Sequence, residues 1–347
     1  MKRLLYFLLF FTLLFTLISF TSKRQSAAHE FTEFSKVNDV LFALGEPKPK
    51  WYPSDLSEEK IKIGKDLVFK GRSVDPDGKQ SDYISVYYMC TSCHNTVQED
   101  PVLTVSNAQA RLDYADEKNL PFLQGTSFRG ITNRESWYND DYYKKYGDLV
   151  EPASDDLREA VQLCATQCAQ GRLLEDWELQ AIMAYYYSIS YTMEEIGFTD
   201  ANMQKFNNAI ADGETGLKQR YIADIKDKYL LKSPATFLEP PYDVYWEKYN
   251  GKGDPENGEK IYRLSCQACH NSYGVSAVVL GDTRQDFKAM GRWFKKNEWW
   301  LHQVVRHGTH PVPGHLPYMP LYTEERMDDQ MIEDLKAFIL KSGEKNS

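Results

Sequence analysis

The sequence predicts a mainly α-helical protein of two compact domains joined by a helical connector. Three observations support this prediction. The pentapeptide Cys-x-x-Cys-His occurs twice, at residues 90–94 and 266–270. A glycine-bearing segment with helical spacing of apolar residues precedes each copy, and an amphipathic helical pattern follows each at a distance. The chain has 347 residues, which is enough for two cores of ordinary size.

Each pentapeptide has the spacing that attaches a c-type haem. Two thiols three positions apart can both form thioether bonds to one porphyrin, and the adjoining imidazole can then bind its iron. Paired Cys/His zinc sites are the alternative. The histidine that adjoins both copies, in a chain with only six cysteines, favours haem. We therefore expect two covalently bound haem c groups, held by Cys90, Cys93 and His94 and by Cys266, Cys269 and His270.

The net charge of the chain argues against polyanionic partners. A net charge of −9 argues against binding to nucleic acid or to an anionic membrane surface. It suits docking to a basic patch on a redox partner, which we expect to be an electron-accepting cytochrome or oxidase. Aromatic residues make up 14% of the chain, which suits domains that enclose flat porphyrins.

The N-terminal segment has the features of an export signal. Lys2 and Arg3 precede an uncharged apolar run over residues 4–20, and small residues at 26–28 form a candidate cleavage site. Residues 1–28 are thus predicted to be a signal peptide or an uncleaved anchor, with a membrane tether through 4–20 in the second case. Either prediction places the protein in the periplasm or on the periplasmic face of the inner membrane, in agreement with the haem motifs.

The rest of the chain divides into four parts. Residues 29–55 are rich in proline and are predicted to be an irregular linker. The first domain is expected over 56–195 and the second over 246–347. Residues 196–245 carry a polar amphipathic helical pattern without Cys or His and are expected to connect the two domains.

The first domain is expected to contain three helices. The first spans residues 59–69 behind an N-cap at Asp55 or Ser57. Residues 101–152 are dense in tyrosine with weak periodicity, and we expect a loop packed over a haem. A second helix is predicted from residue 157 towards Cys168, followed by a third over 175–189. In the second domain, residues 258–262 lead into the haem motif and a last helix is expected over 328–341.

A weak internal repeat relates the two domains. Residues 181–186 align with residues 334–339, so both domains run in the order glycine-bearing helix, haem motif, long loop and terminal helix. This order resembles the class I cytochrome c fold, in which the first and last helices cross. The resemblance covers most of residues 56–192 and 246–343, and it implies two class I cytochrome c-like domains.

The distal ligand of the second haem is predicted to be Met319. This methionine lies in Pro317-Tyr318-Met319-Pro320, shortly before the terminal helix, and a thioether ligand raises the haem potential. The alternatives are that Met319 is a core residue, or that the ligand is one of four nearby histidines. These are His302, His307, His310 and His315.

The first haem has an unusual set of candidate ligands. The chain contains no histidine between His94 and His270. The remaining soft donors expected in the first domain are Cys164, Cys168, Met183 and Met193. By the internal alignment, the two cysteines occupy the place of the distal ligand, so we expect one of them to bind the iron as a thiolate.

Two other states of this cysteine pair stay open. A disulfide is ordinary in an exported protein, and two buried free thiols are the third possibility. On a regular helix, residues four apart have β-carbons ~5–6 Å apart, whereas a disulfide needs ~3.5–4.5 Å. A disulfide between Cys164 and Cys168 would therefore require a break in the helix.

Residues 157–174 read Leu-Arg-Glu-Ala-Val-Gln-Leu-Cys-Ala-Thr-Gln-Cys-Ala-Gln-Gly-Arg-Leu-Leu. With the helix that follows, this stretch resembles the di-haem thiosulfate dehydrogenases and the related haem subunit of Sox complexes. Those relatives have a distal Cys, followed in the dehydrogenases by Gly-Arg or Gly-Lys. On this match Cys164 falls on the ligand position and Cys168 on one that the family need not fill, so the choice between them stays open. Residues 129–134 are also similar to the stretch before that Cys.

The resemblance implies oxidation of thiosulfate to tetrathionate at the first haem, with electrons leaving through the second. An anionic substrate needs cations, and Arg129, Arg134 and Arg172 are candidates to bind it. We expect Arg172 to contact the substrate beside the catalytic ligand Cys164, although each arginine could instead hold a haem propionate.

Two further functions stay open from the sequence. One is a non-catalytic di-haem electron carrier or a cytochrome subunit of a respiratory complex. The other is a di-haem peroxidase, which no feature of the sequence favours. The sequence leaves open whether the protein is an enzyme, its substrate, its haem potentials and its oligomeric state.

Overall fold

The computed structural model describes residues 30–238, 252–296, 299–309 and 318–344. Within these ranges the chain is mainly helical and contains isolated β-bridges but no β-strand, which confirms the prediction of a mainly α-helical fold. None of the helices in the same ranges has the length and apolar character of a membrane span. The predicted export signal lies outside the described residues.

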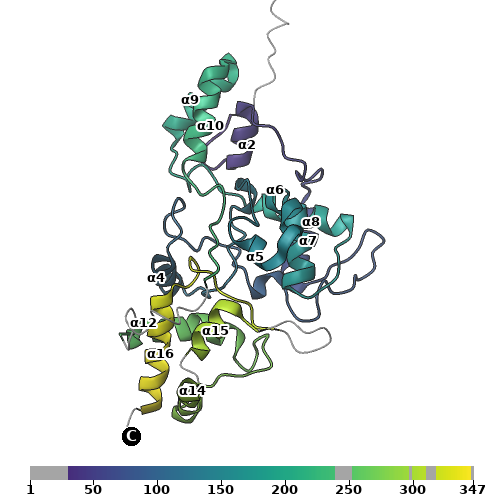
Figure 1. The fold of residues 1–347 in the computed structure, drawn as a ribbon. Coiled ribbons are helices and arrows are strands. Elements are labelled where there is room, and N and C mark those ends of the chain that lie inside the picture. Colours follow the sequence, from purple (N-terminus) through teal and green to yellow (C-terminus); the bar gives the residue numbers. More distant parts are fainter. Residues whose placement is uncertain (1–29, 239–251, 297–298, 310–317, 345–347) are drawn as a thin grey trace, which may run out of the picture.

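The helices form three groups that follow one another along the molecule (Figure 1). The first group, at one end, is α2 (Val37–Leu44), α9 (Asp200–Asp212) and α10 (Thr215–Lys226). The first unit, in the middle, contains α3 (Glu58–Lys70), α5 (Tyr142–Tyr146), α6 (Val150–Asp155), α7 (Leu157–Leu163), the π-helical turn η4 (Cys164–Cys168) and α8 (Asp176–Ser188). The second unit contains α12 (Pro255–Ile261), the π-helical turn η5 (Tyr262–Cys266), α13 (Gln267–Cys269), α14 (Arg284–Lys296), α15 (Trp300–His307) and α16 (Asp329–Glu344).

The first unit is organised by the crossing of α3 and α8. Ser57 caps α3 by accepting a hydrogen bond from the Lys60 backbone amide at 3.3 Å, as the sequence predicts. At the crossing, Gly64 packs so closely on α8 that a Cβ there would overlap the carbonyl of Ala181 and crowd the Cβ of Tyr185. Only glycine lets the two backbones approach this closely.

The second unit repeats this crossing with α12 and α16. A Cβ on Gly258 would overlap the carbonyl of Asp334 and crowd the Cβ of Phe338. In the internal alignment, Asp334 corresponds to Ala181 and Phe338 to Tyr185. The two glycines therefore contact equivalent residues of their terminal helices, so the repeat found in the sequence is also a repeat of packing.

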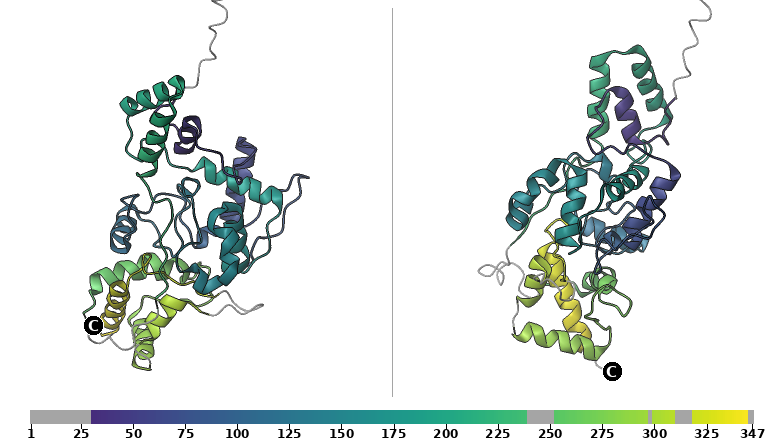
Figure 2. Two further views of the ribbon diagram at one scale, coloured as in Figure 1. Left: turned by 45° about the horizontal axis from the view of Figure 1, so that its top comes forward. Right: turned by 90° about the vertical axis from the view of Figure 1, so that its right-hand side faces the viewer.

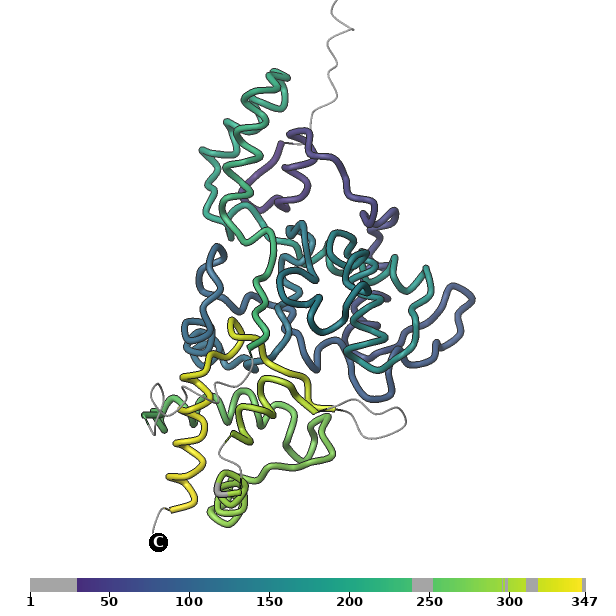
Figure 3. The backbone as a smooth tube through the Cα atoms, in the orientation of Figure 1, coloured from purple at the N-terminus to yellow at the C-terminus, as the bar shows by residue number. Residues whose placement is uncertain are grey.

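The group of α2, α9 and α10 stays together at one end of the molecule in every view (Figure 2). The helical prediction for the connector is confirmed for residues 200–212 and 215–226, but the expectation of an irregular linker over 29–55 is wrong for residues 37–44. Val37, Val40, Leu41 and Leu44 are buried on one face of α2, at the spacing of an amphipathic helix. After α10, the chain runs down beside the first unit towards the second (Figure 3).

The expectation of loop structure over 101–152 is wrong in part, because this region contains α4 (Ala108–Lys118), α5 and the start of α6. Ala108, Leu112 and Ala115 lie on one face of α4 and are buried in the core of the second unit. A segment between the first haem motif and α8 thus packs on the second unit. The domain boundaries at 56–195 and 246–347 stay predictions.

The glycine crossings can be tested in the second unit. We expect Gly258→Ala to destabilise the protein by about 2 kcal/mol, because the new methyl group would overlap the backbone of α16. Gly216→Ala in α10 is the control, since a Cβ there meets nothing within 4 Å. Thermal unfolding of the haem-loaded protein measures both. An equal, small effect of the two substitutions would contradict the close crossing.

Candidate haem sites

The first Cys-x-x-Cys-His motif lies in the short helical turn η1 (Cys90–Ser92) and the residues after it. Nδ1 of His94 is 2.6 Å from the carbonyl oxygen of Thr126, and the ring stacks on Phe128 at 4.4 Å. Since Nδ1–H donates to this carbonyl, Nε2 keeps the lone pair that a metal requires. Burial lowers the pKa of His94 to about 4, so the imidazole is neutral at physiological pH.

A glycine makes room for this imidazole. Gly125 donates a backbone hydrogen bond of 2.9 Å to the carbonyl of Cys93. A Cβ on Gly125 would collide with the His94 ring and the Cys93 carbonyl. The loop before Thr126 can therefore approach the motif only with glycine at this position.

Cys90, Cys93 and His94 line a large cavity, with about 1550 Å³ of empty space including its open mouth. We call it the first-site cavity. Residues from three parts of the chain complete its wall: the first unit, the segment after α10, and the second unit. Its apolar and aromatic lining includes Phe128, Ile131, Leu157, Val161, Leu174, Ile182, Tyr186 and Phe237. An apolar cavity with an available imidazole nitrogen and two thiols on its wall fits a covalently bound haem.

Cys164 and Cys168 line the same cavity. They begin and end η4, where α7 changes to a π-helical turn, so the regular helix expected here is wrong in this detail. Both are free thiols, and the two groups interact electrostatically with each other. The structure thus places the two predicted distal ligands and the first motif on one cavity.

The surroundings of the two cysteines differ. The Cys168 sulfur lies 3.2 Å from the hydroxyl of Tyr146 and 3.5 Å from that of Tyr138. The interaction with the Cys164 thiol lowers the pKa of Cys168, although burial acts against this, and the two tyrosines add to the effect. The same interaction and burial raise the pKa of Cys164. Cys168 is therefore the sulfur that these contacts favour as a thiolate.

The three predicted substrate arginines occupy different places. Arg134 lines the first-site cavity, and its guanidinium donates to the carbonyl of Ser127 at 3.2 Å. Arg172 does not line it, because its two Nη atoms bind the buried carboxylate of Glu178 at 2.7 and 2.6 Å. Arg129 is paired with Glu195 in the same manner, with Nε 3.1 Å from the carboxylate. A substrate contact by Arg172 stays a prediction.

Two cations that the sequence analysis did not single out also line the first-site cavity. Lys145 comes from α5, and Arg326 comes from the second unit, directly before α16. No local pattern marks either residue. Their proximity to the first motif arises only from tertiary packing.

The second motif repeats the geometry of the first. Nδ1 of His270 lies 2.8 Å from the carbonyl oxygen of Val278, and the His270 amide donates to Cys266 at 2.8 Å. The ring is therefore oriented through a backbone carbonyl, as His94 is, and its Nε2 is left for a metal.

Met319 is half-buried, and its backbone amide donates to the Thr309 hydroxyl at 2.6 Å. Its neighbours Tyr318 and Pro320 line the first-site cavity, whereas Met319 does not. The predicted ligation by Met319 stays a prediction.

The alternative histidine ligands lie in different environments. His302 is buried in α15, 3.4 Å from Glu333, and His307 ends the same helix. His310 and His315 lie outside the described residues. Within the described ranges, no three His, Cys, Asp or Glu side chains form a cluster that could hold a metal ion.

The two motifs are neighbours in space. Burial raises the pKa of Cys93, and the nearby Cys269 of the second motif adds to this shift. Tyr88 is close to both thiols, which together with burial raise its pKa, and its hydroxyl donates to the carbonyl of Tyr318. Groups held by the two motifs would therefore lie close to each other.

Comparison with known families supports the assignment of the second unit. Residues 253–339 match the family described as cytochrome c oxidase, cbb3-type, subunit III. The matched segment contains the second Cys-x-x-Cys-His motif, Met319 and most of α16. It is a cytochrome c domain, which implies a covalently bound haem c. No curated protein and no solved structure matches the chain.

The class of protein follows from this match and from the motif geometry. The chain contains a cytochrome c domain, and electron transfer is the activity that this domain supports.

Proposed function

We propose that this protein is a di-haem c-type cytochrome whose first haem oxidises a sulfur oxyanion such as thiosulfate and whose second haem passes the electrons on. The observation that carries the proposal is that Cys164 and Cys168 line the cavity of the first motif. A thiolate on the distal side of a haem changes its potential and reactivity. Such a site differs from the Met/His ligation proposed for the second haem through His270 and Met319.

Several residues around the first-site cavity suit this role. Gly125 and Thr126 hold His94 with Nε2 available, and the hydroxyls of Tyr138 and Tyr146 lie within hydrogen-bond distance of the Cys168 sulfur. Burial and the neighbouring Cys168 thiolate raise the pKa of Tyr146, so its hydroxyl keeps its proton and can donate it to the sulfur. These groups would hold one thiolate ready to bind iron.

The cationic residues of the cavity suit an anionic substrate. Arg134 and Lys145 are the first-unit cations on the wall, and their charges would offset the repulsion between two thiosulfate dianions. Joining two thiosulfates into tetrathionate forms one S–S bond and releases two electrons. Haem c supplies a site that accepts one electron at a time, and two haems together match this stoichiometry.

The second candidate function is a di-haem electron carrier without a substrate. The observation in its favour is the matched family, whose description names a subunit of a cytochrome oxidase. In either case we propose export through residues 1–28, with a periplasmic location or a membrane tether through 4–20. An oxidase or cytochrome with a basic patch is the proposed electron acceptor.

Thiosulfate-dependent reduction separates the two candidate functions. We expect thiosulfate to reduce the oxidised wild-type haems, and Arg134→Gln to require at least about tenfold more thiosulfate, because a charge-assisted contact is lost. Haem absorbance in stopped-flow mixing is the measurement. Arg158→Gln is the control, since Arg158 pairs with Asp176 and does not line the cavity. Wild-type haems that stay oxidised would contradict the enzymatic proposal.

The hydrogen bond from Tyr146 to Cys168 gives a second test. If Cys168 binds the first iron, Tyr146→Phe should lower the midpoint potential of that haem, because the sulfur then donates more charge to the iron. Spectroscopic redox titration measures the potential. Tyr142→Phe is the matched control, because its ring stacks on Tyr146 at 6.3 Å and also lines the cavity. Equal shifts in the two variants would exclude a specific role for the Tyr146 hydroxyl.

A further inference from the structure

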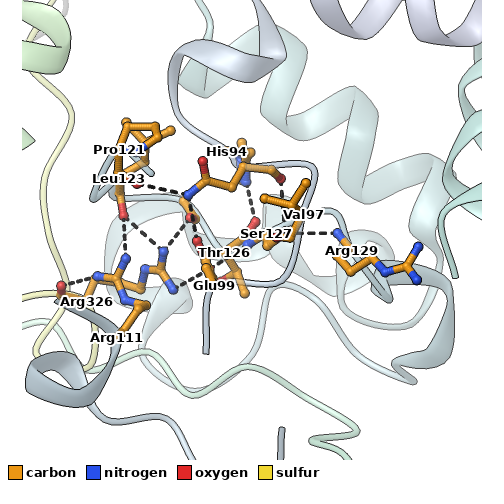
Figure 4. Close-up of polar contacts among 12 residues, drawn as sticks. His94, Val97, Glu99, Arg111, Pro121, Leu123, Thr126, Ser127, Arg129 and Arg326 are labelled. Atoms are coloured by element: carbon orange, nitrogen blue, oxygen red, sulfur yellow. Dashed lines mark hydrogen bonds and ion pairs between the residues drawn. The ribbon is translucent and has the colours of Figure 1, made fainter. Parts of the chain in front are cut away.

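Arg326 belongs to the second unit, but its side chain binds the first. Nη1 lies 2.8 Å from the carboxylate of Glu99, and the side chain of Arg326 is only 6% exposed. Nη2 donates to the carbonyl of Leu123 at 3.0 Å and to that of Gly125 at 2.7 Å (Figure 4). All of these partners belong to the segment that surrounds the first haem motif.

Glu99 completes the connection. Its side chain is 2% exposed. One carboxylate oxygen accepts hydrogen bonds from the Arg326 guanidinium and from the backbone amide of Ser127, the latter at 2.8 Å. The other oxygen accepts from the side chain of Asn95 at 3.1 Å. Burial alone would raise the pKa of Glu99, but the guanidinium groups of Arg326 and Arg111 lower it to about 2. The carboxylate is therefore ionised at neutral pH.

These bonds fix the loop on both sides of the carbonyl that orients His94. Arg326 binds Gly125 directly and Ser127 through Glu99, and Thr126 lies between them. The Thr126 carbonyl accepts from Nδ1 of His94 at 2.6 Å (Figure 4). The direction of this carbonyl sets the plane of the imidazole and the strength of its hydrogen bond. Both properties tune a histidine ligand.

Arg111 supports the same arrangement from α4. Its guanidinium donates to Leu123 at 3.2 Å and to the carbonyl of Arg326, and it lies over the Phe122 ring at 3.8 Å. The shape of the guanidinium matters here. Arg326 uses two Nη atoms for three acceptors in different directions, which the single ammonium of lysine cannot reproduce.

We propose that Arg326 is a positioning residue for the first haem: through Glu99 and Gly125, the second unit sets the orientation of the proximal His94. The inference rests on the proposed function only in taking His94 as an iron ligand. Arg326 of the second unit then controls the ligand field of the haem held by the first unit. The first site is therefore complete only when the two units are packed together.

The test uses the full haem-loaded protein with Arg326→Gln. We expect the midpoint potential of the first haem to fall, since a buried cation beside it is lost, and its low-spin electron paramagnetic resonance g values to change. The second haem should keep its potential and g values, although the substitution lies in its own unit. Arg263→Gln is the control, because Arg263 is also a second-unit arginine that pairs with the segment after the first motif, through Asp116 of α4, but its side chain is 51% exposed. This variant should leave both haems unchanged.

Two further variants separate orientation from charge. The double variant Glu99→Gln/Arg326→Gln removes one charge of each sign, so an effect of charge alone would disappear. A positioning role predicts that its first-haem g values stay altered. Arg326→Lys keeps the positive charge but lacks the two Nη atoms that bind three acceptors, so it should also alter these g values. This variant should fold even if Arg326→Gln does not. First-haem signals unchanged in Arg326→Gln, or restored in the double variant, would overturn the proposal.

The number of haems bound by the wild type and the variants distinguishes a failure of the di-haem function from a failure of the positioning role. Intact mass should show two haems in the wild type and in each variant. A mass with a haem only on the second motif would defeat the di-haem function. Hydrogen exchange would still test the positioning role in that case, because Arg326→Gln should lose protection at the amides of Gly125 and Ser127. Unchanged protection there would overturn it.

Discussion

The hydrogen bond between a motif histidine and a backbone carbonyl is the contact on which both candidate haem sites depend. It selects the tautomer that leaves Nε2 for iron, and it fixes the ring of His94 against Thr126 and that of His270 against Val278. In the first unit, the acceptor loop can approach only because residue 125 is glycine. The remainder of the first-site cavity is arranged around this imidazole.

The cavity is a product of the whole fold. Its wall combines residues of the first unit with Tyr318 and Arg326 of the second, and with residues such as Phe237 that follow α10. The contacts of α4 with the second core join the two units further. Because Cys93 and Cys269 are neighbours, a short path for electrons between the two sites is consistent with this packing.

The sequence predicted the features that depend on local pattern. The motifs, a helix N-cap at Asp55 or Ser57, and the helices that became α3, α8 and α16 could all be recognised from spacing. The internal repeat went further, since it paired the residues that Gly64 and Gly258 contact in the folded chain. An apolar stripe in α2 was also present in the sequence but was missed among the prolines that follow it.

Other features could not be predicted because they depend on burial and tertiary packing. Glu178 is six residues from Arg172 along the chain, yet only the fold shows that it is buried and holds the guanidinium. The contact between Arg326 and Glu99 joins two units and has no signal in either segment. The π-helical turn at Cys164–Cys168 depends on packing rather than on a residue pattern.

The most direct test of the central claim is low-temperature electron paramagnetic resonance of the oxidised protein, compared with Cys164→Ala and Cys168→Ala. The account predicts two low-spin haem signals, one of them with the narrow g spread of thiolate ligation. One of the two substitutions should abolish this signal, and the contacts around Cys168 favour that residue. Two signals of Met/His or bis-nitrogen character, unchanged by both substitutions, would contradict the claim.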